Sequence, residues 1–118
     1  MNEEIKSILG NSIEVNGENI PVAHLRYKGD SKKFVTWTLL EETPSLSAND
    51  EDLYSVCSVD VDIFSESNYL DIIKEVKTKM KNNDWAWVGD SSEMYEEDTE
   101  LYHKTCTFEK ERALQWQE

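Results

Sequence analysis

The chain has 118 residues and a mass of 13.7 kDa, a size typical of one domain. Its 25 Asp and Glu residues against 12 Lys and Arg give a formal net charge of −13, and such a surface repels phosphate backbones, which argues against direct, non-specific nucleic-acid binding. The N-terminus lacks a secretion signal, no stretch is long and apolar enough to span a membrane, and the two cysteines match no metal spacing, so we expect a cytosolic protein.

The first half of the chain predicts one short helix and two strands. Apolar residues at helical spacing predict a helix over 2–9, and an Asn-Gly pair at 16–17 predicts a turn. Strands are expected over 20–27 and 34–42, and apolar residues on both faces of the second are typical of a central strand or of a strand at an interface. Residues 43–52 are polar and end in three acids, so we expect a loop there.

The second half predicts a long strand, a helix and a closing hairpin. Residues 53–64 alternate with one nearly apolar face, and a strand of this length is expected to bend or to project from the domain. Apolar residues three or four apart then predict a helix that begins at Ser65 or Ser67. The segment 85–111 predicts two strands joined by an acidic stretch. The whole pattern predicts one α+β domain over residues 1–118, with a single mainly antiparallel sheet of about five strands and two helices packed on one face.

Few residues are spaced for catalysis or metal binding. Asp60 and Asp62 share one strand face, and paired carboxylates can act as acid and base or hold a cation, although a solvated sheet face explains them as well. Neither His24 nor His103 has a second His or Cys at ligand spacing. Cys106 and His103 are three residues apart on a strand, so their side chains point to opposite faces and form no catalytic pair. We therefore expect no enzymatic activity, no bound metal and no cofactor.

The candidate functional residues are acids and tyrosines in or beside loops. Acids occupy positions 50–52 and 96–98, and a tyrosine borders each group. Aromatic side chains beside charge are common at protein interfaces, although solvation alone also accounts for acidic loop tips. The interface candidates are Asp50, Glu51, Asp52, Tyr54, Tyr95, Glu96, Glu97 and Asp98.

The order of motifs over residues 20–111 resembles that of small tail completion proteins, or tail terminators, of phages and prophages of Gram-positive bacteria. The resemblance is carried by the strand end at 59–65 (VDVDIFS), by the helix that follows it, and by the final hairpin with 95–99 (YEEDT) and 101–104 (LYHK). Glu100 stands where relatives tend to have glycine, which argues against a tight turn at that position.

The resemblance implies a structural role with no catalytic residues. Such proteins form a ring, commonly of six subunits, on the head-proximal end of the tail tube, where the ring stops tube polymerisation and docks the head connector. It implies an α+β domain whose partners are further copies of itself, the tail tube protein and the head–tail connector, with DNA as a passing cargo that is not bound. It also implies a location in the host cytoplasm during assembly and then in the virion tail. In a ring, the interface candidates would face a neighbouring subunit or the lumen, where acids repel passing phosphates.

One alternative comes from another functional class. The total charge and the long segment 41–52 equally fit an acidic inhibitor that mimics DNA or sequesters a basic protein. The placement of the acids separates the two functions. A mimic needs acids in a band spaced like phosphates along one face, whereas a terminator needs them on the ring lumen and in loops.

Overall fold

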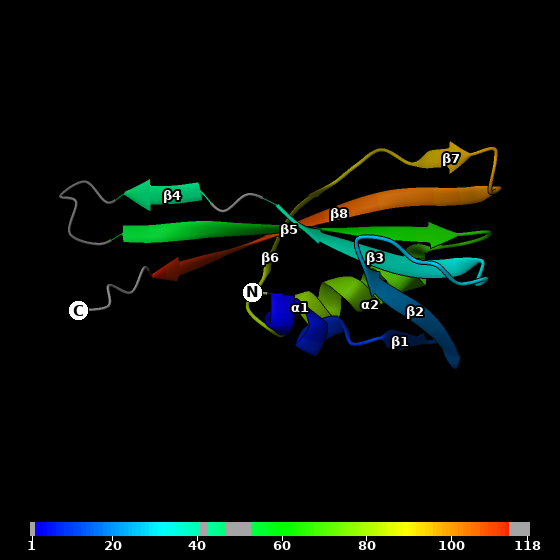
Figure 1. Cartoon of the computed structure of the whole chain (residues 1–118), viewed down its shortest axis with the longest axis horizontal. Coiled ribbons are helices and arrows are strands. Elements are labelled where there is room, and N and C mark those ends of the chain that lie inside the picture. The colour runs from blue at the N-terminus through cyan, green and yellow to red at the C-terminus, as the bar shows by residue number, and fades with distance from the viewer. Residues whose placement is uncertain (1, 41–42, 47–52, 114–118) are drawn as a thin grey trace.

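The computed structural model describes residues 2–40, 43–46 and 53–113 (Figure 1). Within these ranges the chain forms two helices, α1 (Asn2–Leu9) and α2 (Leu70–Lys81). Its strands are β1 (Ser12–Val15), β2 (Glu18–His24), β3 (Lys33–Leu39), β4 (Thr43–Leu46), β5 (Leu53–Ser65), β6 (Ala86–Asp90), β7 (Met94–Glu96) and β8 (Leu101–Ala113).

The strands form one sheet in the order β1-β2-β3-β5-β8-β6, with β4 added beside β5 and β7 beside β8. Only β2 and β3 run parallel, and the other pairs are antiparallel. The two central strands, β5 and β8, have 13 residues each and pair along most of their length. As expected for a strand this long, β5 projects beyond the helices together with β4 and the end of β8 (Figure 1).

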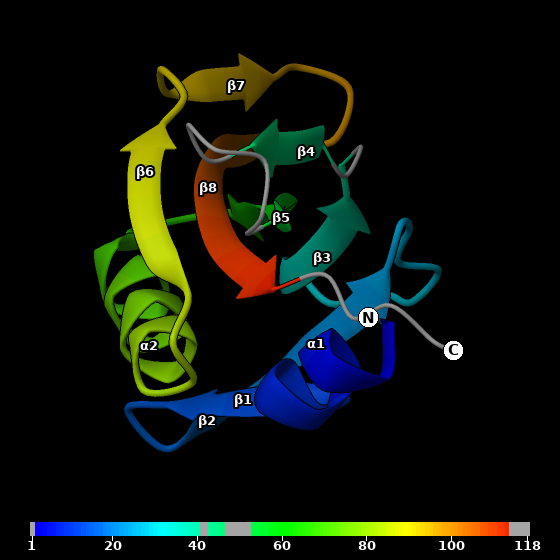
Figure 2. The same ribbon diagram turned by 90° about the vertical axis from the view of Figure 1, so that its left-hand side faces the viewer.

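The hydrophobic core lies between the two helices and one face of the sheet. Both helices lie on the same side of β3, β5 and β8 (Figures 1 and 2), and alternate residues of these strands point toward them because side chains alternate along a strand. The class predicted from the sequence, an α+β domain with a mainly antiparallel sheet, is therefore confirmed. The buried residues of the core are Ile5, Leu9, Ile13, Ile20, Val22, Val35, Trp37, Cys57, Val59, Val61, Ile63, Ile72, Ile73, Val76, Met80, Trp85, Cys106 and Phe108.

The sheet has more strands than the sequence pattern predicts, eight within the described residues rather than about five. The additional strands β1, β4 and β7 have only three or four residues each, too few for alternation to be visible. The prediction of a loop over 43–52 is wrong at its start, because residues 43–46 pair with 53–56 of β5. Each of these short strands pairs with one neighbour only, at the margin of the sheet.

Helix α2 begins at Leu70, later than the predicted start at Ser65 or Ser67. Ser65 still belongs to β5, where it pairs with residues of β3 and β8. The side-chain oxygen of Asn68 accepts a hydrogen bond of 2.9 Å from the backbone N–H of Leu70. An asparagine rather than a serine therefore satisfies a backbone donor where the helix starts.

Candidate functional site: an acidic pocket at one end of the sheet

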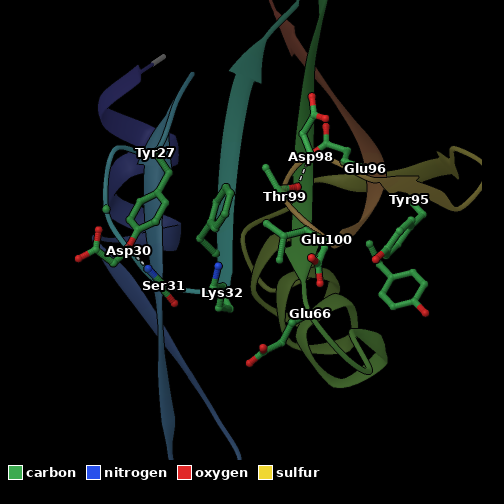
Figure 3. Close-up of a pocket in the computed structure, with 14 residues that line it drawn as sticks. Tyr27, Asp30, Ser31, Lys32, Glu66, Tyr95, Glu96, Asp98, Thr99 and Glu100 are labelled. Carbon is green, nitrogen blue, oxygen red and sulfur yellow. Dashed lines mark hydrogen bonds between the residues drawn. The ribbon is translucent and has the colours of Figure 1, made fainter.

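A pocket of about 1000 Å³ lies where the connection between β2 and β3 approaches the turn between β7 and β8. Figure 3 shows the two walls: residues of the β2–β3 connection on one side, and residues of the β7–β8 turn facing them. We call it the acidic pocket. It is lined by Tyr27, Gly29, Asp30, Ser31, Lys32, Phe34, Glu66, Tyr95, Glu96, Asp98, Thr99, Glu100, Leu101 and Tyr102.

The charge of the acidic pocket is strongly one-sided. Its lining includes five carboxylates and a single cation, Lys32. Residues 93–100 alone contribute five acids to this end of the molecule and no Lys, Arg or His. A concave surface of one sign raises the local concentration of ions and side chains of the opposite sign. The pocket is therefore suited to receive cationic groups, next to four aromatic side chains that can contact their apolar stems.

The β7–β8 turn is tight, contrary to the expectation from the glutamate at position 100. The backbone N–H of Glu100 donates a hydrogen bond of 2.8 Å to the carbonyl oxygen of Glu96. The hydroxyl of Thr99 donates another, of 3.2 Å, to the carboxylate of Glu96. Glu100 has a φ of 59°, a left-handed conformation that glycine adopts more easily. The turn is formed even though its sequence is not the best one for it.

A stack of aromatic rings leads from the pocket wall across the sheet. The ring centroids of Tyr27 and Phe34 are 4.5 Å apart, those of Phe34 and Phe64 are 4.6 Å apart, and those of Phe64 and His103 are 4.1 Å apart. Phe34, Phe64 and His103 belong to β3, β5 and β8, on the face opposite the core. The stack therefore fixes one wall of the acidic pocket to the three central strands.

The carboxylates of Asp60 and Asp62 take part in a polar network on the same face. Asp62 accepts hydrogen bonds from Nε2 of His103, at 2.9 Å, and from the hydroxyl of Thr105, while Asp60 accepts one of 2.7 Å from the hydroxyl of Thr107. Burial acts to raise the pKa of Asp62, but the hydrogen bonds from His103 and Thr105 and the charge of His103 outweigh it and hold that pKa below its usual value. Both carboxylates thus have structural partners, and neither lines the acidic pocket.

The cysteines and histidines are arranged as the sequence predicts. Cys106 points into the core from β8, whereas His103 lies on the opposite face. Burial, followed by a hydrogen bond to Asp90, raises the pKa of the Cys106 thiol to about 12, which removes the thiolate needed for nucleophilic attack. Within the described residues, no group of three or more His, Cys, Asp or Glu side chains is placed to hold a metal ion. In that part of the chain no helix has both the length and the apolar character that crossing a membrane requires.

The structure brings one of the two predicted acidic groups into the pocket. Tyr95, Glu96 and Asp98 line it, and Glu97 is exposed in the same turn. Tyr95 is 51% exposed, and its ring lies 5.1 Å from that of Tyr102. These four candidates therefore occupy one continuous surface at the end of the sheet.

The other predicted acidic group is not placed. Asp50, Glu51 and Asp52 lie outside the described residues. Tyr54 belongs to β5, where it pairs with Ser45 of β4, but its side chain is not among those described. The part of the predicted interface formed by these four residues stays a prediction.

The wall of the acidic pocket formed by the β2–β3 connection was not predicted from the sequence. Tyr27, Asp30 and Lys32 precede β3 by a few residues, about 65 positions before the acidic turn. Asp30 and Lys32 are ordinary residues of a polar turn, Tyr27 was expected to end the strand over 20–27 although β2 stops at His24, and no local pattern links the three to the C-terminal hairpin. The only available signal is the aromatic pair Tyr27 and Phe34 on either side of the turn.

An exposed apolar edge adjoins the pocket. Seven large hydrophobic side chains are exposed among the described residues, and four of them lie along β6 and β7: Trp87, Val88, Met94 and Tyr95. Strand β6 ends the main strand order and has no partner on its outer side within the described sheet. Edge strands with apolar side chains invite pairing with other chains, so this edge is a candidate contact surface.

Comparison with known proteins leaves the function to be inferred from the chain itself. No model of a known protein family matches the sequence, and no curated protein matches it at a significant level. The acidic pocket, the apolar edge and the order of motifs are therefore the features on which a functional proposal has to rest.

Proposed function

We propose that this protein is a structural component of a phage or prophage tail that caps the head-proximal end of the tail tube as a ring. The resemblance implies six subunits in this ring. The observation that carries the proposal is the motif order over residues 20–111, which resembles that of tail completion proteins. An α+β sheet with flanking helices is also what this resemblance implies, and the fold supports the proposal to that extent.

The surfaces of the molecule favour assembly over catalysis. The acidic pocket and the apolar edge along β6 and β7 are adjacent, and together they combine one-sided charge with exposed aromatic residues. Such combinations are typical of surfaces that contact other proteins. The side chains with catalytic potential are engaged elsewhere, in the core for Cys106 and in the polar network for Asp62 and His103.

The net charge has a role in such a ring and also a cost. Acids on the lumen wall repel the phosphates of passing DNA, so that DNA slides without sticking. Six copies at −13 each would carry a formal charge of −78, so ring closure has to overcome self-repulsion. We therefore expect free protein to be monomeric at low ionic strength and to assemble when salt screens the repulsion or when the tube end provides a template.

Growth of tail tubes tests the proposal. Tail tube protein from the same genome is polymerised with and without this protein, and growth is followed by light scattering. Substoichiometric protein should stop growth at shorter lengths, because a cap needs only one ring per tube. Unchanged tube growth at a molar excess of the protein would contradict the proposal.

The alternative function, sequestration of a basic partner, is favoured by one observation, the excess of five carboxylates over one lysine in the lining of the acidic pocket. The five acids within residues 93–100 are concentrated in one short segment, which fits a local binding patch better than a phosphate-like band along a face. If the protein binds a basic host protein and has no effect on tail tubes, the inhibitor function is the one supported.

A further inference from the structure

The solvent-facing side of α2 carries a shallow apolar groove with lysines at its rim. The groove has a volume of about 300 Å³. Leu70, one of the side chains that line it, is 62% exposed, more than any other large hydrophobic side chain in the described residues. The side chains that line the groove are Leu70, Ile73, Lys74, Lys77, Thr78 and Lys81.

The charges around this groove are unbalanced. Among the described residues, neither Lys74 nor Lys81 forms an ion pair. Neither acid of the same helix lines the groove: Glu75 pairs with Lys79 one turn later, and Asp71 accepts a hydrogen bond from Asn16. The groove therefore combines apolar side chains with lysines at its rim, on a protein that is otherwise strongly acidic.

The β7 hairpin has the complementary features. Tyr95 is half exposed, and its ring contacts the ring of Tyr102, which restricts its motion. The exposed acids Glu96, Glu97 and Asp98 follow it directly. A tyrosine with a polar tip and an apolar body is a frequent anchor at protein interfaces, and a groove of 300 Å³ admits one aromatic ring.

The two surfaces lie on different sides of the molecule. In Figure 2, β7 is at the top and α2 at the lower left, with β6 between them. Tyr95 is not part of the groove of its own chain. A contact between the hairpin of one copy and the groove of another joins two different surfaces, so each added copy leaves one free hairpin and one free groove. Such head-to-tail contacts form a ring when the rotation closes.

We propose that the β7 hairpin of one copy docks on the α2 groove of a second copy, with Tyr95 on Leu70 and Ile73 and the acids after it facing Lys74 and Lys81. This inference rests on the proposed function and deepens it, since it names the surfaces by which neighbouring subunits of the ring meet. Charge complementarity within one chain carries it: the acidic turn and the lysine rim are opposite in sign and each flanks an exposed apolar group.

The contact gives association an unusual dependence on salt. At about 0.01 M salt the Debye length is roughly 30 Å, so the net charges of two whole copies repel each other. At about 0.15 M it is roughly 8 Å, which screens the distant charges but leaves ion pairs at contact distance largely intact. At about 1 M the local pairs weaken as well. Association should therefore be strongest at intermediate salt.

A charge exchange tests the contact. One variant carries Glu96→Lys, Glu97→Lys and Asp98→Lys, and the other carries Lys74→Glu and Lys81→Glu; each affected side chain is exposed, so both variants should fold. Analytical ultracentrifugation at about 0.15 M salt should show that each variant alone associates about tenfold or more weakly than the unchanged chain. Mixed together, they should associate again, because every hairpin then meets a groove of opposite charge.

A matched control separates the contact from net charge. Glu3→Lys, Glu14→Lys and Glu111→Lys change the net charge as much as the hairpin variant does, at exposed positions on other elements. This control should associate at least as well as the unchanged chain. The proposal would be overturned if the mixed variants did not associate again, or if the control lost association as much as the hairpin variant. It would also be overturned if the unchanged chain stayed monomeric at every salt concentration, even at millimolar protein.

The apolar half of the contact has its own test. Tyr95→Ala and Leu70→Asp should each weaken association about tenfold or more, whereas Val88→Ala, at a site with similar exposure to Tyr95, should not. Equal effects of all three would overturn the docking of Tyr95.

The contact between copies and the capping function can be contradicted independently of each other. If the mixed variants associate again but do not affect tail tubes, the contact is supported and the capping function is contradicted. If each charge variant alone still caps tubes, the capping function is supported and the contact is contradicted.

Discussion

Nε2 of His103 lies 2.9 Å from Oδ1 of Asp62, and this contact joins two sets of side chains on the face of the sheet opposite the core. On one side of it, the rings of Tyr27, Phe34 and Phe64 continue the stack that ends on His103. On the other side, threonine hydroxyls of β8 donate hydrogen bonds to the two aspartates of β5. Because these contacts cross β3, β5 and β8, they fix the pocket wall formed by Tyr27 and Phe34 to the central strands of the sheet.

Replacement of Asp62 by asparagine should reveal a pH-dependent part of the stability. Burial acts to raise the folded-state pKa of Asp62, but its hydrogen bonds outweigh burial and lower this pKa. The stability that the ionised carboxylate contributes is therefore present above the unfolded pKa of about 3.9 and is lost as pH falls through the folded pKa. Asp62→Asn should cost about 1–2 kcal/mol at neutral pH and much less near pH 3. Urea denaturation at both pH values measures the difference, and an equal cost at both would contradict it.

Gly29→Ala should disturb the wall of the pocket. A Cβ at position 29 would lie 2.1 Å from the phenol oxygen of Tyr27, so the ring would have to move. Movement breaks the 3.0 Å hydrogen bond that the backbone N–H of Ser31 donates to that oxygen, and a loss of about 1 kcal/mol is expected. In a Tyr27→Ala background the same change should cost almost nothing. Equal costs in the two backgrounds, measured by urea denaturation, would rule out this explanation.

Glu100→Gly should stabilise the protein. Glu100 holds a φ of 59°, which costs an ordinary residue about 1 kcal/mol that glycine does not incur. The free energy of unfolding should therefore rise by up to about 1 kcal/mol. Asp98→Gly in the same turn should give no gain, because there the glycine only increases the entropy of the unfolded chain. A loss of stability on Glu100→Gly would show that the glutamate side chain contributes more than the backbone strain costs.

Both cysteines should resist thiol reagents until the protein unfolds. Cys57 and Cys106 are 1% and 0% exposed, and burial raises the pKa of Cys106 to about 12. A chromogenic disulfide reagent at pH 8 should react at the rate of unfolding in buffer and with both thiols at once in concentrated urea. Fast reaction of either thiol in buffer would show that this part of the core opens in the native state.

The elements with strong periodicity were predictable from the sequence. The alternation of β5 and the helical spacing in α2 are long enough to identify each element, and the core face of β5 is the predicted one. The start of α2 was not predictable, because β5 continues through Ser65 by pairing with distant strands. The short strand β4 was missed for the same reason, since its pairing with β5 rather than its composition makes it a strand.

The candidate site was predictable only in part. Tyr95, Glu96 and Asp98 form a local cluster that composition alone reveals. The wall around Tyr27 and Lys32 depends on the tertiary fold, which carries the β2–β3 connection to the β7–β8 turn. The groove on α2 was also missed, because lysines in the last turns of a helix are fully explained by the helix dipole.

Electron microscopy of tail tubes incubated with this protein tests the central claim most directly. Tubes assembled from the tail tube protein of the same genome are imaged with the protein present, and the density at both ends is compared. A ring of subunits at one end only, with tubes that no longer grow from that end, is the result predicted for a cap. Bare tube ends, or protein bound evenly along the tube walls, would contradict the assignment.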